Sequence, residues 1–175
     1  MKVFLWLMLS TLLIAAPLTQ ADISNLKTRK VKEHIIYETY LETDKGLASV
    51  FGYQFDTFFN EHQCFILAIS GAVNGERGGY GFAAFGLGQE IPIHPKLALN
   101  FRLFMGSGGG GGLDAGGGFM LEGHMGLIYY LTPNMGLEIN TGSLTYPTGT
   151  FGTPMVNIGI QFTDRQIFLP WESNS

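Results

Sequence analysis

Apolar and polar residues alternate along most of the chain after residue 30. In the segment 96–106, one set of alternate positions holds Leu97, Leu99, Phe101, Leu103 and Met105. The intervening positions hold Lys96, Ala98, Asn100, Arg102 and Phe104. A repeat of two places the first set on one face of a β-strand and the second set on the other. Segments 119–131 and 154–163 show the same pattern, so the sequence predicts an all-β protein.

Turn-forming residues divide the chain into eight predicted strands of similar length. They cover residues 31–42, 47–59, 63–74, 79–91, 96–106, 119–131, 135–146 and 154–163. Strands of soluble proteins average about five or six residues, whereas a tilted strand that crosses a bilayer needs about nine to eleven. Each predicted strand has 10 to 13 residues, which favours membrane-spanning strands.

Short and longer connections alternate from the third predicted strand onward. The short ones are residues 60–63, 92–95 and 132–134, and the longer ones are 75–78, 107–118 and 147–153. Bacterial outer-membrane barrels have this asymmetry, with tight periplasmic turns and larger outside loops. The exception is 43–46, a short connection where an outside loop is expected. The order of strands and connections predicts an eight-stranded antiparallel up-and-down transmembrane β-barrel.

The composition of the polar face separates a membrane barrel from a soluble one. A soluble barrel points its apolar face inward and its charged face to water, whereas a membrane barrel reverses this order. Charged residues make up only 14% of the chain, fewer than a solvated outer face normally carries. The polar face is instead rich in small residues, which fit the narrow lumen of eight strands. We therefore favour the membrane barrel over a soluble exported barrel that binds a small apolar ligand.

The N-terminal segment has the order of an export signal. Lys2 is followed by an apolar stretch at 3–16, Pro17, and the small-residue exit Thr19-Gln20-Ala21. The apolar stretch is shorter than the roughly 20 residues that a retained membrane helix needs. We expect a signal peptide at 1–21, cleaved after Ala21. The remaining divisions are a periplasmic lead-in at 22–30, the barrel at 31–163 and a C-terminal tail at 164–175.

Charge and cysteine content exclude other classes. The net charge is −4 and no basic run is present, so we expect no nucleic-acid partner. Cys64 is the single cysteine, which allows no internal disulfide, and we interpret it as a small buried side chain.

Two motifs carry a family resemblance. One is the turn at 131–138, Leu-Thr-Pro-Asn-Met-Gly-Leu-Glu, and the other is the last strand with Val156, Ile158, Ile160 and Phe162 at alternate positions. With the eight alternating strands, the chain resembles small bacterial outer-membrane barrels of the OmpA, OmpX and OmpW kind. The resemblance implies location in the outer membrane of a Gram-negative bacterium. We also expect contact with membrane lipid and lipopolysaccharide, and with extracellular or envelope proteins through loops 107–118 and 147–153.

The polar faces of strands five to seven predict a network inside the lumen. Its predicted members are Lys96, Asn100, Arg102, Glu122, His124 and Glu138. We expect Arg102 nearly opposite Glu122, with Asn100 and His124 one step deeper. Lys96 is expected to reach Glu138 across Gly126, which has no side chain. Because buried charges are costly unless paired, these groups predict salt bridges that fill the lumen, which is then no open pore.

Catalytic motifs are absent from the sequence. The enzymatic alternative is a lipid A-modifying hydrolase or acyltransferase, and deacylases of that class resemble one another through His-x-Ser on a strand. No histidine of the chain is followed by serine two positions later. The nearest variant, His62-x-Cys64, lies at a predicted periplasmic turn, away from the outer leaflet. We therefore expect no enzyme and no catalytic residue.

The glycine run between Gly106 and Gly118 does not form a phosphate-binding loop, because it lacks the following helix and the Lys-Ser/Thr pair. Asp114 alone makes no calcium site, and the histidines and acidic residues show no metal-ligand spacing. The sequence therefore predicts neither a cofactor nor a metal ligand. The predicted role is structural or interactive, in envelope integrity or loop-mediated binding.

Overall fold

The computed structural model describes residues 27–41, 47–75 and 78–168. The predicted signal segment 1–21, the first part of the predicted lead-in and residues 169–175 of the predicted tail lie outside the described residues. Within the described part, no helix is long and apolar enough to cross a membrane.

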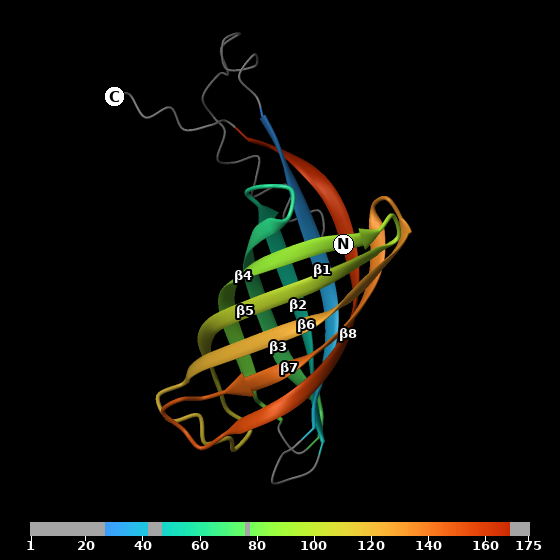
Figure 1. Cartoon of the computed structure of the whole chain (residues 1–175). Coiled ribbons are helices and arrows are strands. Elements are labelled where there is room, and N and C mark those ends of the chain that lie inside the picture. Colours follow the sequence, from blue (N-terminus) through green and yellow to red (C-terminus); the bar gives the residue numbers. More distant parts are fainter. Residues whose placement is uncertain (1–26, 42–46, 76–77, 169–175) are drawn as a thin grey trace, which may run out of the picture. The chain divides into compact units, whose positions relative to one another are not determined.

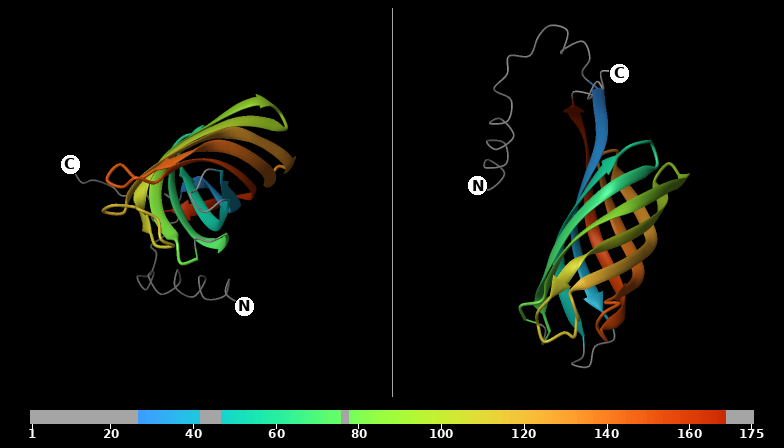
Figure 2. Two further views of the ribbon diagram at one scale, coloured as in Figure 1. Left: turned by 90° about the horizontal axis from the view of Figure 1, so that it is seen from below. Right: turned by 90° about the vertical axis from the view of Figure 1, so that its left-hand side faces the viewer.

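The described residues form eight strands. They are β1 (Lys27–Tyr40), β2 (Ala48–Phe58), β3 (Gln63–Asn74), β4 (Gly81–His94), β5 (Leu97–Gly109), β6 (Phe119–Thr132), β7 (Met135–Thr145) and β8 (Gly152–Phe168). Each strand pairs with the next in the chain, and the order β1 to β8 closes into a barrel. The strands are tilted and wind around a common axis (Figures 1 and 2). The predicted fold class, an eight-stranded antiparallel up-and-down barrel, is confirmed.

The first and last strands are longer than predicted. β1 begins at Lys27 and β8 ends at Phe168, whereas the sequence predicted limits at 31 and 163. The added residues are mostly polar and do not alternate, so the sequence pattern could not mark them as strand. Residues Arg29–Gln166 form one compact unit, the barrel itself.

Alternation along each strand separates the outer and inner surfaces of the barrel. In β5, Leu99, Phe101, Leu103 and Met105 point outward, and Leu103 is 71% exposed. The same holds for large apolar residues on the other strands, including Ile35, Phe51, Leu67, Leu87, Leu127, Ile139 and Ile158. Water-soluble proteins rarely expose such a continuous apolar surface. The outer surface of the barrel therefore suits lipid.

Short turns and longer loops lie at opposite ends of the barrel. The turns at 59–62, 95–96 and 133–134 gather at the upper end in Figure 1, and the loops at 110–118 and 146–151 at the lower end. We call these the turn end and the loop end. The asymmetry matches the sequence prediction, although the connection 43–46 lies outside the described residues.

The glycine-rich loop 110–118 is folded against the loop 146–151. The Asp114 carbonyl accepts hydrogen bonds from the backbone nitrogens of Thr150 and Phe151, each at 3.2 Å. The Thr150 hydroxyl donates to the Asp114 carboxylate at 2.8 Å, and the Gly117 nitrogen donates to the Thr148 hydroxyl at 3.1 Å. The hydrogen bond from Thr150 and that from a backbone N–H hold the pKa of Asp114 below its usual value. The two loops therefore form one docked unit.

Candidate functional site: the closed lumen

The turn end of the lumen is closed by a buried ion pair. The Lys32 ammonium lies 2.7 Å from each carboxylate oxygen of Glu90. Lys32 also donates to the Tyr130 hydroxyl at 3.1 Å and to the Gln161 side-chain oxygen at 3.4 Å. The Lys30 ammonium lies 3.5 Å from the centre of the Phe58 ring at the same end. Both charges of the pair are therefore compensated inside the barrel.

A second group of charges fills the middle of the lumen. His34 places Nδ1 2.9 Å from Glu138 and Nε2 3.0 Å from Asp56. The Arg102 guanidinium lies 3.2 Å from Glu138 and 3.6 Å from Asp56. Gln54 donates to the other Asp56 oxygen at 2.7 Å. We call His34, Asp56, Arg102 and Glu138 the central network. Two carboxylates alternate here with two basic groups, which offsets much of the cost of burying them.

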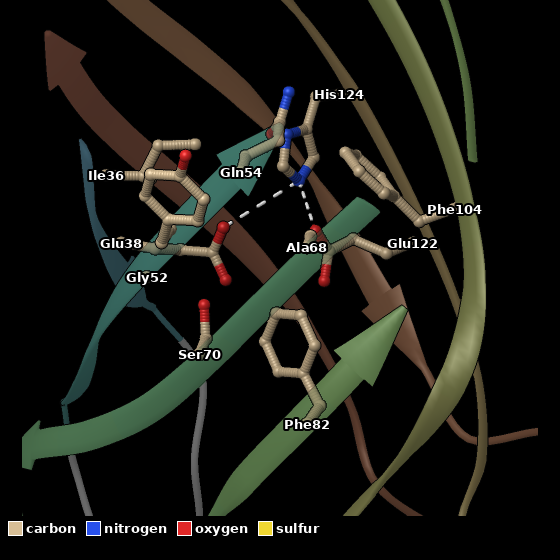
Figure 3. Close-up of a pocket in the computed structure, with 11 residues that line it drawn as sticks. Ile36, Glu38, Gly52, Gln54, Ala68, Ser70, Phe82, Phe104, Glu122 and His124 are labelled. Atoms are coloured by element: carbon tan, nitrogen blue, oxygen red, sulfur yellow. Dashed lines mark ion pairs between the residues drawn. The ribbon is translucent and has the colours of Figure 1, made fainter. Parts of the chain in front are cut away.

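A third group lies nearer the loop end and borders a small cavity. His124 Nε2 lies 2.6 Å from Glu122 Oε1 and 3.7 Å from Glu38 Oε2. The cavity measures about 20 Å³ and is lined on its other sides by Gly52, Gln54, Ala68, Ser70, Phe82 and Phe104. Figure 3 shows both carboxylates directed toward the imidazole of His124. We call Glu38, Glu122 and His124 the carboxylate–histidine cluster.

Aromatic and aliphatic side chains close the loop end. The Tyr80 hydroxyl lies 3.0 Å from that of Tyr146 and 3.4 Å from that of Tyr40. Val50, Ala115, Met120, Leu144 and Met155 pack with these tyrosines in one buried cluster. Ala115 comes from the docked loop, so this tyrosine plug joins the loops to the barrel interior. Together with the polar groups that lie between it and the turn end, the plug fills much of the described lumen.

Small residues make room for the large ones. A Cβ atom on Gly126 would clash with the Asn140 side chain and the Ile139 carbonyl oxygen, and one on Gly159 would lie 2.8 Å from Glu138 Oε1. The bulky side chain thus occupies the space that the glycine leaves on the neighbouring strand. This arrangement agrees with the cramped lumen that the sequence indicated.

The structure places five of the six sequence-predicted lumen residues inside the barrel. Asn100, Arg102, Glu122, His124 and Glu138 are all less than 8% exposed. Lys96 is wrongly predicted, because β5 begins only at Leu97 and Lys96 is exposed in the 95–96 turn. Its backbone nitrogen donates to His94 Nδ1 at 3.3 Å. Glu138 therefore pairs with His34 and Arg102 instead of Lys96.

The predicted pairing of Arg102 with Glu122 is also wrong. Arg102 lies opposite His124, and Glu122 lies opposite Phe104. The observed β5–β6 register differs by two residues from the predicted one. The last paired residues before the loop are Ser107 on β5 and Phe119 on β6. Asn100 lies in the lumen as predicted, but its side-chain amide makes no hydrogen bond to any described residue.

Five of the nine buried charged or histidine residues of the described lumen lie on strands where the sequence named no site residue. These are Lys32, His34 and Glu38 on β1, Asp56 on β2 and Glu90 on β4. On β2 the alternation of Gln54 and Asp56 with aromatic residues was a usable signal. On β1 the signal is weak, since Ile36 points inward and Glu33 outward.

Comparisons with known proteins support the fold. The sequence matches no protein-family model and no curated protein. The structure is similar to the N-terminal β-barrel domain of Pseudomonas aeruginosa OprF, with 14% identity, 77% of this chain and 97% of that chain covered, and a TM-score of 0.55. It is also similar to Ail, the attachment invasion locus protein of Yersinia pestis, and to Neisserial surface protein A. For each of these the identity is 13%, the coverage is 78% of this chain and 98% of the other, and the TM-score is 0.51.

The fold class follows from three observations. They are these structural likenesses, the closed eight-stranded topology, and an outer surface that is apolar while the lumen is polar. The chain has the fold of the small eight-stranded transmembrane β-barrels, with an apolar exterior and a filled polar lumen. The predicted resemblance to small outer-membrane barrels is thereby confirmed at the level of fold.

Proposed function

We propose that this chain is an outer-membrane protein of a Gram-negative bacterium with a structural or surface-interaction role, and that it is neither a pore nor an enzyme. The observation that carries the proposal is the combination of an apolar outer surface with a lumen closed by the central network and the tyrosine plug. A soluble exported barrel with a ligand inside would need the opposite polarity and an empty apolar interior. Neither feature fits the described residues.

The docked loops support the surface-interaction role. Loops 110–118 and 146–151 hold one another through backbone and side-chain hydrogen bonds, and Tyr146 and Ala115 anchor them in the plug. A loop pair held in this way loses little conformational entropy when it binds. We propose that it contacts lipopolysaccharide or an extracellular or envelope protein.

The closed lumen predicts the absence of an open channel. We expect the protein, purified in detergent and inserted into planar lipid bilayers, to give no steady ionic conductance, because charged pairs and the plug fill the barrel. A general porin added to the same bilayers serves as the positive control. Regular conductance steps from this chain would contradict the closed lumen.

The non-enzyme proposal is tested by the lipid that surrounds the barrel. Overproduction of the chain in a Gram-negative host should leave the mass spectrum of lipid A unchanged. A lipid A species that has lost or gained an acyl chain would contradict the proposal that this protein is not an enzyme.

A further inference from the structure

The carboxylate–histidine cluster brings together three metal-ligand side chains from opposite walls of the lumen. Glu122 and His124 lie on β6, and Glu38 lies on β1. One ligand atom from each residue lies within 4.8 Å of the other two. All three side chains are buried, at no more than 4% exposed. The sequence indicated Glu122 and His124 as lumen residues but not Glu38, because register and barrel closure, not sequence spacing, bring β1 and β6 face to face.

The charges of the described lumen do not balance at this cluster. The buried carboxylates are Glu38, Asp56, Glu90, Glu122 and Glu138, and the buried basic groups are Lys32, His34, Arg102 and His124. Lys32 compensates Glu90, and the two basic groups of the central network compensate its two carboxylates. The cluster has two carboxylates and one imidazole. With both carboxylates ionised, even a fully protonated His124 leaves one negative charge, and an uncompensated buried charge is costly.

Unsatisfied oxygens provide a second, independent observation. Glu38 Oε1 and Glu122 Oε2 are buried and accept no hydrogen bond within the described structure. Buried carboxylate oxygens normally have a hydrogen-bond or metal partner. The adjoining cavity of about 20 Å³ is large enough for one water molecule. In Figure 3 both carboxylates and the His124 ring lie along the border of this cavity.

The groups around the cluster can orient His124 as a ligand. Asn157 Nδ2 lies 3.2 Å from His124 Nδ1, and Asn140 Nδ2 donates to Asn157 Oδ1 at 2.7 Å. The oxygen and nitrogen of an amide are exchanged by a half-turn of the group. If both amides turn, Asn157 Oδ1 accepts from the Nδ1–H of His124, and Asn157 Nδ2 donates to Asn140 Oδ1, which has no partner in its present position. The same turn gives up the hydrogen bond that Asn157 Nδ2 donates to Glu38 Oε2 at 3.4 Å in the present orientation. A histidine that binds metal through Nε2 needs this kind of acceptor at Nδ1.

We propose that Glu38, Glu122 and His124 bind one divalent first-row transition-metal ion, with zinc as the best fit. One imidazole nitrogen and two carboxylate oxygens form a donor set suited to zinc, and water in the cavity supplies the fourth position. The ion would neutralise the excess negative charge and join β1 to β6 across the lumen. Its role is structural, and the metal site does not depend on whether the loops bind a partner.

The test uses the full chain extracted from membranes in detergent, treated with EDTA, and dialysed against zinc sulfate. We expect about one zinc per chain by elemental analysis and a higher unfolding temperature with zinc than with EDTA, because a ligand that binds the folded state stabilises it. Glu38→Gln and His124→Gln should each lower zinc affinity by more than about tenfold. Glu90→Gln, which removes a buried carboxylate at the turn end, should retain it.

Cobalt gives a readout that needs no variant. Co²⁺ added to the EDTA-treated wild-type chain should produce visible ligand-field absorption, which zinc then abolishes by displacing the cobalt. The proposal is overturned if the wild-type chain retains no zinc, gives no cobalt absorption, or binds zinc with the same affinity after Glu38→Gln. Absence of metal binding would mean that a proton, not a metal ion, compensates the cluster.

Discussion

Replacing Leu103 with arginine is expected to destabilise the folded barrel in a bilayer by about 2–4 kcal/mol. This is the cost of arginine on the lipid face near the membrane midplane. Leu103 lies at the centre of β5 and points outward. On the surface of a water-soluble barrel the same change would alter stability by only about 0.5 kcal/mol. The size of the effect therefore distinguishes a surface that faces lipid from one that faces water.

Leu131→Arg provides the matched control. Leu131 also points outward, but it is the last but one residue of β6 and lies close to the turn end. Arginine near the membrane interface costs about 0–1 kcal/mol. Denaturant titration in lipid vesicles measures both variants. Equal, small effects at the two positions would count against a membrane-spanning β5.

The second large effect is expected at Arg102. Arg102→Gln removes a cation from the central network. His34 is then the remaining basic partner of Asp56 and Glu138 in that network. Breaking a buried ion pair by removing one partner costs about 3–5 kcal/mol. We expect a loss of folding free energy of this size, measured by denaturant titration in detergent. Arg165→Gln, at an exposed position of β8, should cost less than about 0.5 kcal/mol.

A double variant tests the pairing itself. Arg102→Gln combined with Glu138→Gln removes both partners, so its loss should be clearly smaller than the sum of the two single losses. By contrast, Arg102→Gln and Glu90→Gln act on separate groups and should add. Additive losses for Arg102 and Glu138 would contradict the pairing in the central network.

The architecture was predictable because alternation is a local property. The outward set Leu97, Leu99, Phe101, Leu103 and Met105 of the sequence analysis faces outward in the structure, except that Leu97 and Leu99 are only partly exposed. Asn157 and Gln161, at polar positions of the alternating pattern in β8, are likewise buried. Strand length and turn chemistry supplied the rest of the topology.

The contacts of the lumen were less predictable because they depend on register and on strands far apart in sequence. An error of two residues in the β5–β6 register was enough to place Arg102 opposite Glu122 instead of His124. The partners of Arg102, Asp56 and Glu138, lie on β2 and β7, and their approach requires barrel closure. On β1, the inward Ile36 and outward Glu33 obscure the alternation that would have marked His34 and Glu38.

Cell fractionation followed by gel electrophoresis with and without heating tests the central claim most directly. A transmembrane barrel with this outer surface should remain with the outer-membrane fraction and should require detergent for extraction. Because the closed barrel resists unfolding in SDS until heated, the unheated sample should migrate differently from the heated one. Recovery of the chain in the soluble periplasmic fraction, with the same mobility before and after heating, would contradict the account.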